Sequence, residues 1–251
     1  MPGTTRSYPQ LCPNVIFAAT PPNDGTLARY YRTPADLAYE LPDHLSLEDG
    51  AMIEPLAVGV HSVYTLAQVR PNQVVAVFGA GPVGLLAMAV ARACGARRVI
   101  AIDIMESRLK FAKSYAATDV FFPPEIKEGE SRMTYSKRSS ETLKKELGVA
   151  ASGADGVDVI IEASGAEVSI QTGYYLIKPG GVFVQVGAGP LDVQVPVHLL
   201  LSKEFVIKGS FRCVLFFKTH IASDFSPDMA QAIILSPSPS LAMERSTSSL
   251  W

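Results

Sequence analysis

The sequence predicts an α/β fold built on a doubly wound parallel sheet of six strands. Three observations support this prediction. Short apolar runs alternate with helical patterns from Val74 onward, the chain is 48% hydrophobic but only 18% charged, and a glycine-rich turn joins the first apolar run to a helix. A parallel sheet covered by helices has such a composition because its strands are buried on both faces. At 251 residues, one large or two medium domains are expected.

The first part of the chain follows a different pattern. Residues 1–45 contain many Pro and Thr and predict short strands and turns. Ser46 begins a predicted helix as its N-cap, with Asp49 as an imperfect capping-box partner. This helix runs to about residue 68 and is apolar nearly all round, which predicts that it is buried.

Glu54 is the only charged residue between Gly50 and Gln68, and Pro55 follows it. Proline has no backbone N–H, so we expect a distortion there. A carboxylate on a buried helix is costly unless it is paired, protonated or bound to a metal. Two interpretations stay open: an acid turned to solvent at the kink, or an active-site acid held by it.

The alternating region supplies the elements of the sheet. It predicts strands at 74–78, 98–102, 119–122, 157–161, 182–186 and 205–209, and helices at 82–94, 106–114, 140–147 and 166–176. Residues 124–140 are polar, with several Lys, Arg and Ser, and predict a solvated loop. After Arg212 no regular pattern persists, and the Ser- and Pro-rich stretch to Trp251 predicts poor order.

The glycine-rich turn, Gly79–Gly84, has the spacing of a dinucleotide fingerprint. Gly79 permits the tight turn, Gly81 lets a pyrophosphate approach the backbone, and Gly84 lets the helix pack closely on the sheet. The helix N-terminus offers N–H groups to the phosphates, and Pro82 suits its first turn. The alternative is a glycine-rich turn that binds no dinucleotide.

Asp103 ends the next predicted strand, about 20 residues after the motif, where its carboxylate can accept hydrogen bonds from two ribose hydroxyls. It would repel a 2′-phosphate, and Ile104 and Met105 cannot bind one, so NAD is predicted rather than NADP. Arg108 is expected over the adenine or paired with Asp103. Enzymes that use S-adenosylmethionine also place an acid here, so a methyltransferase remains an alternative.

Composition excludes other classes. A net charge of −2 leaves no electrostatic footprint for nucleic acid. The three cysteines are far apart and indicate a reducing compartment rather than a disulfide framework. Val74–Ala91 carries no charge, but three Gly and a Pro interrupt it, so it is read as a buried strand and helix rather than a membrane span. We therefore expect no membrane partner and a cytoplasmic protein.

Several segments carry a resemblance to a known family: CPNVIFAATPPNDGTLARYY, GAMIEPLAVGVHSV, VFGAGPVGLLAMAVARACGARRVIAID, IEASGAE, KPGGVFVQVGAG and IKGSFR. Over about residues 11–212 the chain resembles the polyol dehydrogenases, of xylitol and sorbitol type, in the zinc-dependent medium-chain superfamily. The resemblance implies NAD-dependent oxidation of a secondary alcohol of a sugar polyol to the ketose. Zinc lowers the pKa of the alcohol in such enzymes, and hydride passes to the nicotinamide.

The resemblance also implies a domain organisation. Residues 61–212 would form a Rossmann NAD-binding domain. Residues 1–60 would be the remnant of a GroES-like catalytic domain with a connecting helix, and 213–251 a divergent tail. The implied partner is a small polyol, and a homo-oligomer is compatible with the family.

Site residues follow from the matching motifs. Glu54 is implied beside the catalytic zinc, and Arg212 near both cofactor and substrate. Cofactor contacts are implied for Gly79, Gly81, Val83, Gly84, Asp103, Arg108, Val186, Gly187, Ala188, Ser210, Phe211 and Arg212.

The resemblance is incomplete around zinc. The family's main ligands, a Cys and a His–Glu pair, come from a segment that this sequence lacks. Cys12 matches the last of four cysteines of a structural zinc site, and one thiolate cannot build a tetrahedral site. We therefore expect impaired turnover in a truncated or alternatively spliced product, a remnant that holds NAD. An active polyol dehydrogenase and a zinc-free reductase are the alternatives, and Glu54 and Phe211 favour the polyol enzymes.

Overall fold

The computed structural model describes residues 11, 13–35, 38, 40–43 and 45–212. Within them a six-stranded sheet has the order β3-β2-β1-β4-β5-β6, and every neighbouring pair is parallel. The order reverses between β1 and β4, so the carboxyl ends of these strands flank the point where doubly wound sheets bind ligands. The predicted fold class is confirmed. The strands are β1 (Val74–Phe78), β2 (Arg98–Ile102), β3 (Asp119–Phe121), β4 (Val157–Glu162), β5 (Ile177–Gln185) and β6 (Val206–Gly209).

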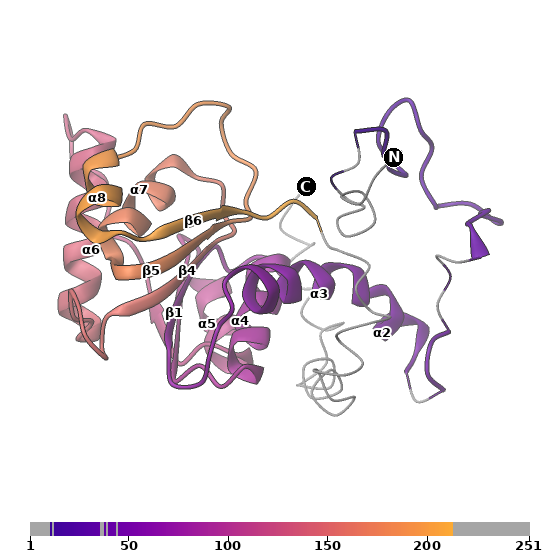
Figure 1. The fold of residues 1–251 in the computed structure, drawn as a ribbon, viewed down its shortest axis with the longest axis horizontal. Coiled ribbons are helices and arrows are strands. Elements are labelled where there is room, and N and C mark those ends of the chain that lie inside the picture. Colours follow the sequence, from indigo (N-terminus) through magenta and orange to yellow (C-terminus); the bar gives the residue numbers. More distant parts are fainter. Residues whose placement is uncertain (1–10, 12, 36–37, 39, 44, 213–251) are drawn as a thin grey trace.

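Helices cover both faces of the sheet (Figure 1). One face packs against α3 (Ile53–Val60), η3 (His61–Leu66), α4 (Pro82–Ala93) and α5 (Glu106–Tyr115). The other packs against α6 (Arg132–Leu147), α7 (Glu167–Leu176) and α8 (Val197–Lys203). Side chains alternate along a strand, so β1 serves two cores. Val75 and Val77 join the α4 side, whereas Ala76 and Phe78 join the α6 and α7 side.

The predicted strands agree closely with the observed ones. β1 and β2 have the predicted bounds, and β3, β4 and β6 differ by one residue at one end. β5 begins earlier than predicted, because Ile177 already pairs with Val157 before the register shifts at the Pro-Gly-Gly segment. The helices predicted at 82–94, 106–114 and 166–176 correspond to α4, α5 and α7 within one residue at either end.

The loop predicted at 124–140 is wrong from residue 132 onward, where α6 begins. Ser131 caps this helix by accepting a hydrogen bond from the Thr134 N–H. Small serines form much of its buried face, at Ser136, Ser139 and Ser140. Because this face is not apolar, the sequence shows none of the hydrophobic periodicity by which a helix is predicted.

The helix predicted from Ser46 to about residue 68 is divided into three pieces. Ser46 and Asp49 form the expected capping box at the start of α2 (Leu47–Ala51). The helix breaks at Met52 because Pro55, in the first turn of α3, cannot donate to a carbonyl of the preceding turn. The last piece, η3, is a π-helix in which the Ala67 N–H donates to the Ser62 carbonyl at 3.0 Å.

Two further differences from the prediction concern residues outside the sheet. In the described residues before Leu47 the chain forms turns and bends, so the short strands expected there are not found. A strand needs a hydrogen-bonded partner, and this part of the described chain pairs with none. The short helix α8 was not predicted, since its seven residues span fewer than two apolar repeats. The tail predicted at 213–251 lies outside the described residues.

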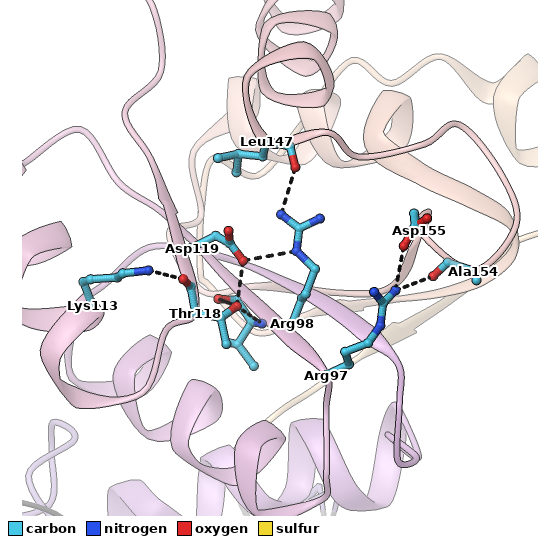
Figure 2. A network of polar contacts seen from close by, with 9 residues as sticks. Arg97, Arg98, Lys113, Thr118, Asp119, Leu147, Ala154 and Asp155 are labelled. Carbon is cyan, nitrogen blue, oxygen red and sulfur yellow. Dashed lines mark hydrogen bonds and ion pairs between the residues drawn. The ribbon is translucent and has the colours of Figure 1, made fainter.

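A polar network closes the amino-terminal edge of the sheet (Figure 2). The Arg98 side chain donates to the Asp119 carboxylate at 3.1 Å and to the Leu147 carbonyl at 2.9 Å. Arg97 donates to the Asp155 carboxylate at 3.0 Å. These contacts tie the starts of β2, β3 and β4 to the end of α6, at the edge opposite the carboxyl ends of the strands.

The uncharged run from Val74 to Ala91 forms β1, the glycine-rich turn and part of α4. Across the part of the chain that the structure describes, we find no helix with the length and hydropathy needed to cross a membrane.

Candidate cofactor-binding site

The glycine-rich turn leaves β1 in a conformation that suits glycine. Gly79 has φ +90°, and its N–H donates to the Ile102 carbonyl at the end of β2. A Cβ on Gly79 would lie 3.1 Å from backbone atoms of Ala163 and Ser164. The turn therefore lies in close contact with the segment that follows β4, at the switch point of the sheet.

Gly81 caps α4 and leaves space at the helix N-terminus. A Cβ built on Gly81 would meet no described atom within 4 Å, although its φ of −76° is open to any residue. Pro82 occupies the first turn, and Val83 follows it half-buried. The N-terminus of a 12-residue helix is a favourable place for an anion, because its first N–H groups lack intrahelical partners. The open space at Gly81 fits the close approach of a pyrophosphate.

Gly84 brings α4 against the turn. A Cβ at this position would lie 1.9 Å from the Gly79 carbonyl oxygen. No side chain fits at that distance, so Gly84 is required for the packing of α4 on β1. The first and third glycines of the motif thus shape the protein, whereas the second leaves room for a ligand.

Asp103 joins the glycine-rich turn to β2. Its Oδ2 accepts a hydrogen bond from the Ala80 N–H at 2.7 Å, and its Oδ1 accepts one from the Met105 N–H at 2.9 Å. The Arg108 guanidinium lies 3.9 Å from Oδ2. Of the two expectations for Arg108, the structure therefore shows the ion pair with Asp103. Asp103 is only 7% exposed. Each carboxylate oxygen can accept more than one hydrogen bond, so the acid retains capacity for ribose hydroxyls.

The segments after β4 and β5 meet above the sheet. The Val186 and Gly187 N–H groups both donate to the Glu162 backbone carbonyl at 2.8 Å. A Cβ on Gly187 would lie 2.3 Å from the Gly165 nitrogen, so these backbones are in direct contact. Ala188 follows and is exposed. The predicted residues Val186, Gly187 and Ala188 therefore lie at the same edge of the sheet as the glycine-rich turn.

Sequence reasoning missed Glu162, the last residue of β4. Its carboxylate is fully buried, and burial raises its pKa. It accepts hydrogen bonds from backbone and side-chain groups of both segments. An acid closing an apolar strand was the one available signal, because its partners come from the segment after β4 and from Gln185 at the end of β5.

Ser210, Phe211 and Arg212 follow β6. The Ser210 N–H donates to the Gln185 carbonyl at 2.8 Å, while its hydroxyl oxygen is shielded from solvent and has no partner among the described residues. Such an orphaned hydroxyl suits a bound ligand that accepts or donates a hydrogen bond. The Arg212 guanidinium lies 3.3 Å from the centroid of the Phe17 ring, and Phe17 and Phe211 are arranged edge to face. This cluster connects the first described segment to the end of the sheet.

Glu54 lies in the first turn of α3 with an exposed side chain, so the structure has it turned to solvent at the interruption of the helix. His61, seven residues later, is buried, and burial lowers its pKa. Among the described residues no three His, Cys, Asp or Glu side chains lie close enough together to hold a metal ion. Cys12 lies outside those residues. The described part of the chain therefore does not fit a zinc ion by itself.

The comparisons with known proteins agree with this geometry. Probable D-xylulose reductase A of Aspergillus fumigatus is 50% identical over 204 residues, which are 80% of this chain and 53% of that protein. The chain thus spans about half the length of the curated relatives it matches. The crystal structure of galactitol-1-phosphate dehydrogenase from Escherichia coli has a TM-score of 0.67 at 26% identity, covering 94% of this chain and 60% of that one.

A putative zinc-binding dehydrogenase from Sinorhizobium meliloti 1021, solved bound to NADP, has a TM-score of 0.70 at 26% identity, covering 90% of this chain and 59% of that one. The family model described as zinc-binding dehydrogenase matches residues 82–231, more than half of the chain. These matches set aside the methyltransferase alternative. The chain belongs to the zinc-binding dehydrogenase family, and the predicted resemblance to its polyol dehydrogenases is confirmed.

Proposed function

We propose that the chain binds NAD at the carboxyl edge of its sheet and serves the oxidation of a secondary alcohol of a sugar polyol to the ketose. The observation that carries the cofactor assignment is the 2.7 Å hydrogen bond between Asp103 and the Ala80 N–H. It joins the ribose-binding acid directly to the phosphate-binding turn. The polyol substrate rests on the relatives named D-xylulose reductase A, which this chain matches over about half their length.

Each part of the cofactor has a proposed position. The pyrophosphate would lie at Gly81, against the N-terminus of α4, with Val83 in the first turn of the helix. The adenine ribose would donate to Asp103, with Arg108 beside it. Because Asp103 is negatively charged and partly neutralised by only one arginine, a 2′-phosphate would be repelled, and we propose NAD rather than NADP. One structural relative was solved with NADP, so this preference needs a direct test.

The nicotinamide end would lie along Val186–Ala188, with the unpartnered Ser210 hydroxyl available to it. Phe211 and Arg212 would border this end of the site. The described residues supply too few ligands for zinc, so we derive no step through a metal. Glu54 is proposed to face the reacting alcohol, and its side chain is exposed.

Titration of the full chain with NAD and NADP tests the cofactor assignment. We expect NAD to bind at least tenfold more tightly. In Asp103→Asn an oxygen remains for the Ala80 N–H while the charge is removed. The difference in affinity between NAD and NADP should therefore become smaller. Equal affinities in the wild-type protein would overturn the assignment of NAD.

Turnover is tested separately. Formation of NADH from xylitol or sorbitol is measured with and without added zinc, and bound metal is measured on the same sample. NAD binding without turnover would indicate the remnant that holds the cofactor. Turnover that needs no zinc would favour a zinc-free reductase.

We further propose a division into residues 1–60, 61–212 and 213–251, a cytoplasmic location and assembly as a homo-oligomer. The first boundary falls inside the helical run of α3 and η3. The location is supported by the three separated cysteines.

A further inference from the structure

Glu162 is a buried carboxylate surrounded by hydrogen-bond donors. Its Oε1 accepts from the Ser164 N–H at 3.0 Å, and its Oε2 accepts from the Gly165 N–H at 2.9 Å. The Ser164 hydroxyl also donates to Oε1, and the Gln185 amide donates to Oε2 at 2.7 Å. The side chain is 0% exposed.

The charge of this group is not balanced by a cation. No ion pair within the described residues includes Glu162. Burial of a carboxylate is costly unless hydrogen bonds replace its hydration. Here all of that compensation comes from two segments, Ser164–Gly165 after β4 and Gln185 at the end of β5.

These two segments form a continuous stack with the glycine-rich turn. Gly79 contacts Ala163 and Ser164 through backbone atoms. A Cβ on Gly189 would lie 2.0 Å from the Gly165 carbonyl oxygen, and a Cβ on Gly165 would lie 2.5 Å from the Ala188 carbonyl oxygen. The middle segment of the stack is the one that Glu162 holds.

Gln185 links the carboxylate to the far segment. Its amide nitrogen donates both to Glu162 and to the Gly187 carbonyl, the latter at 2.8 Å. A single side-chain amide thus connects the buried acid to the middle of Val186–Ala188. Glu162 thus reaches Val186–Ala188 through side-chain hydrogen bonds, whereas its link to Gly79 runs through the backbone of Ser164.

We propose that Glu162 is a positioning residue that fixes Val186–Ala188 for the nicotinamide half of the cofactor. It acts through Gln185 and Gly165 and touches no reacting atom. This inference rests on the proposed function, because it assumes that the nicotinamide lies along Val186–Ala188. The adenosine and pyrophosphate half depends on Asp103 and Gly81, which Glu162 does not contact.

The test compares two ligands on the full chain. NADH carries the nicotinamide, whereas ADP-ribose lacks it. In Glu162→Gln an NH₂ group replaces one of the two acceptor oxygens and meets donors, and the charge to which Gln185 donates is removed, so the bridge is weakened. We expect the Kd of NADH to rise about tenfold or more. The Kd of ADP-ribose should stay within about twofold.

A merely structural role would affect both ligands alike, so parallel losses would overturn the proposal. Unchanged NADH affinity in the variant would also overturn it. If wild-type protein bound neither ligand, the proposed function itself would fail, which is a distinguishable result. The fluorescence of bound NADH gives a second readout, because it reports the surroundings of the nicotinamide.

Two further variants control the experiment. Gln185→Leu breaks the bridge from its other end and should show the same selective loss, so it carries the test if Glu162→Gln does not fold. Equal affinities of Gln185→Leu and wild type for NADH would contradict the proposed route. Glu146→Gln makes the same chemical change on the exposed face of α6. It should leave both affinities at wild-type values.

Discussion

Replacement by alanine should have opposite effects at the second and third glycines of the turn, Gly81 and Gly84. In Gly81→Ala the new methyl group meets no described atom within 4 Å, and φ −76° is allowed for alanine. In Gly84→Ala the new Cβ would lie 1.9 Å from the Gly79 carbonyl oxygen. The first change should therefore affect the ligand, and the second should affect the fold.

The structure sets the expected magnitudes. Gly81→Ala should change the free energy of unfolding by less than about 1 kcal/mol, since alanine restricts the unfolded chain but is a poorer N-cap than glycine. The methyl group would occupy the space proposed for the pyrophosphate, and loss of one charge-assisted hydrogen bond costs roughly 1.5–3 kcal/mol of binding. This corresponds to a rise in the Kd of NADH of about tenfold to a hundredfold.

Gly84→Ala requires a displacement of α4. Carbon and carbonyl oxygen approach to about 3.3 Å in folded proteins, so the helix would have to move by more than an ångström. Leu86, Met88 and Val90 on this helix are buried and would move with it. Overpacking of this kind costs typically about 1–3 kcal/mol, and the free energy of unfolding should fall by at least that amount.

Two measurements on each variant check these expectations. Urea unfolding followed by far-UV circular dichroism gives stability, and NADH fluorescence titration gives affinity. The reasoning is refuted if Gly81→Ala binds NADH like the wild type, or if it unfolds as easily as Gly84→Ala.

Three other predictions concern stability. Arg138 lowers the pKa of Glu130 to about 2, below its usual 4.5; the pair therefore stabilises the fold above pH 4.5, and this contribution is lost as the pH falls toward 2. The urea midpoint of wild type and of Glu130→Gln is measured at neutral pH and at about pH 3, and the midpoint of the variant should fall less between the two pH values. Equal falls in the two proteins would contradict this assignment. Arg98→Met removes the contacts at the amino-terminal edge (Figure 2) and should lower the free energy of unfolding by about 2 kcal/mol. The affinity of Arg98→Met for NADH should equal that of wild type, because Arg98 lies at the edge of the sheet opposite the proposed cofactor site. A loss of affinity would show that the two edges are coupled. Lys203 donates to three carbonyls near the end of α7; Lys203→Met leaves them without this donor and should cost about 1–3 kcal/mol in urea unfolding, whereas an unchanged midpoint would show that water replaces the lysine.

The strands were predictable because the sheet is buried on both faces. All of β1 and the last four residues of β2 are continuous apolar runs, and such runs leave few alternatives to a buried strand. The helix α6 was predictable only in its last part, where Leu143 lies among buried residues. Its earlier turns bury small serines instead of apolar side chains. Ser136 donates to the Gln171 side chain at 3.0 Å.

Some residues of the candidate site could likewise be predicted from the sequence, and others could not. The glycine motif is local in sequence, so the geometric tasks of Gly79, Gly81 and Gly84 could be derived from the spacing of the motif. Asp103 was predictable from its spacing, although its hydrogen bond to Ala80 was not. Glu162 could not be predicted, because sheet pairing alone brings Gln185 to it. The catalytic assignments of Glu54 and Arg212 stay predictions.

The hydrogen bond between Asp103 and Ala80 has a consequence for coenzyme engineering. Replacing Asp103, the acid proposed to repel the extra phosphate, is the direct way to make this chain accept NADP. In this chain the same carboxylate anchors a buried backbone N–H of the phosphate-binding turn, since Ala80 is only 2% exposed. A substitution such as Asp103→Ala would leave that N–H unsatisfied, at a cost of roughly 1–3 kcal/mol. Acceptance of the bulkier coenzyme would therefore require a second change that supplies a new acceptor for Ala80.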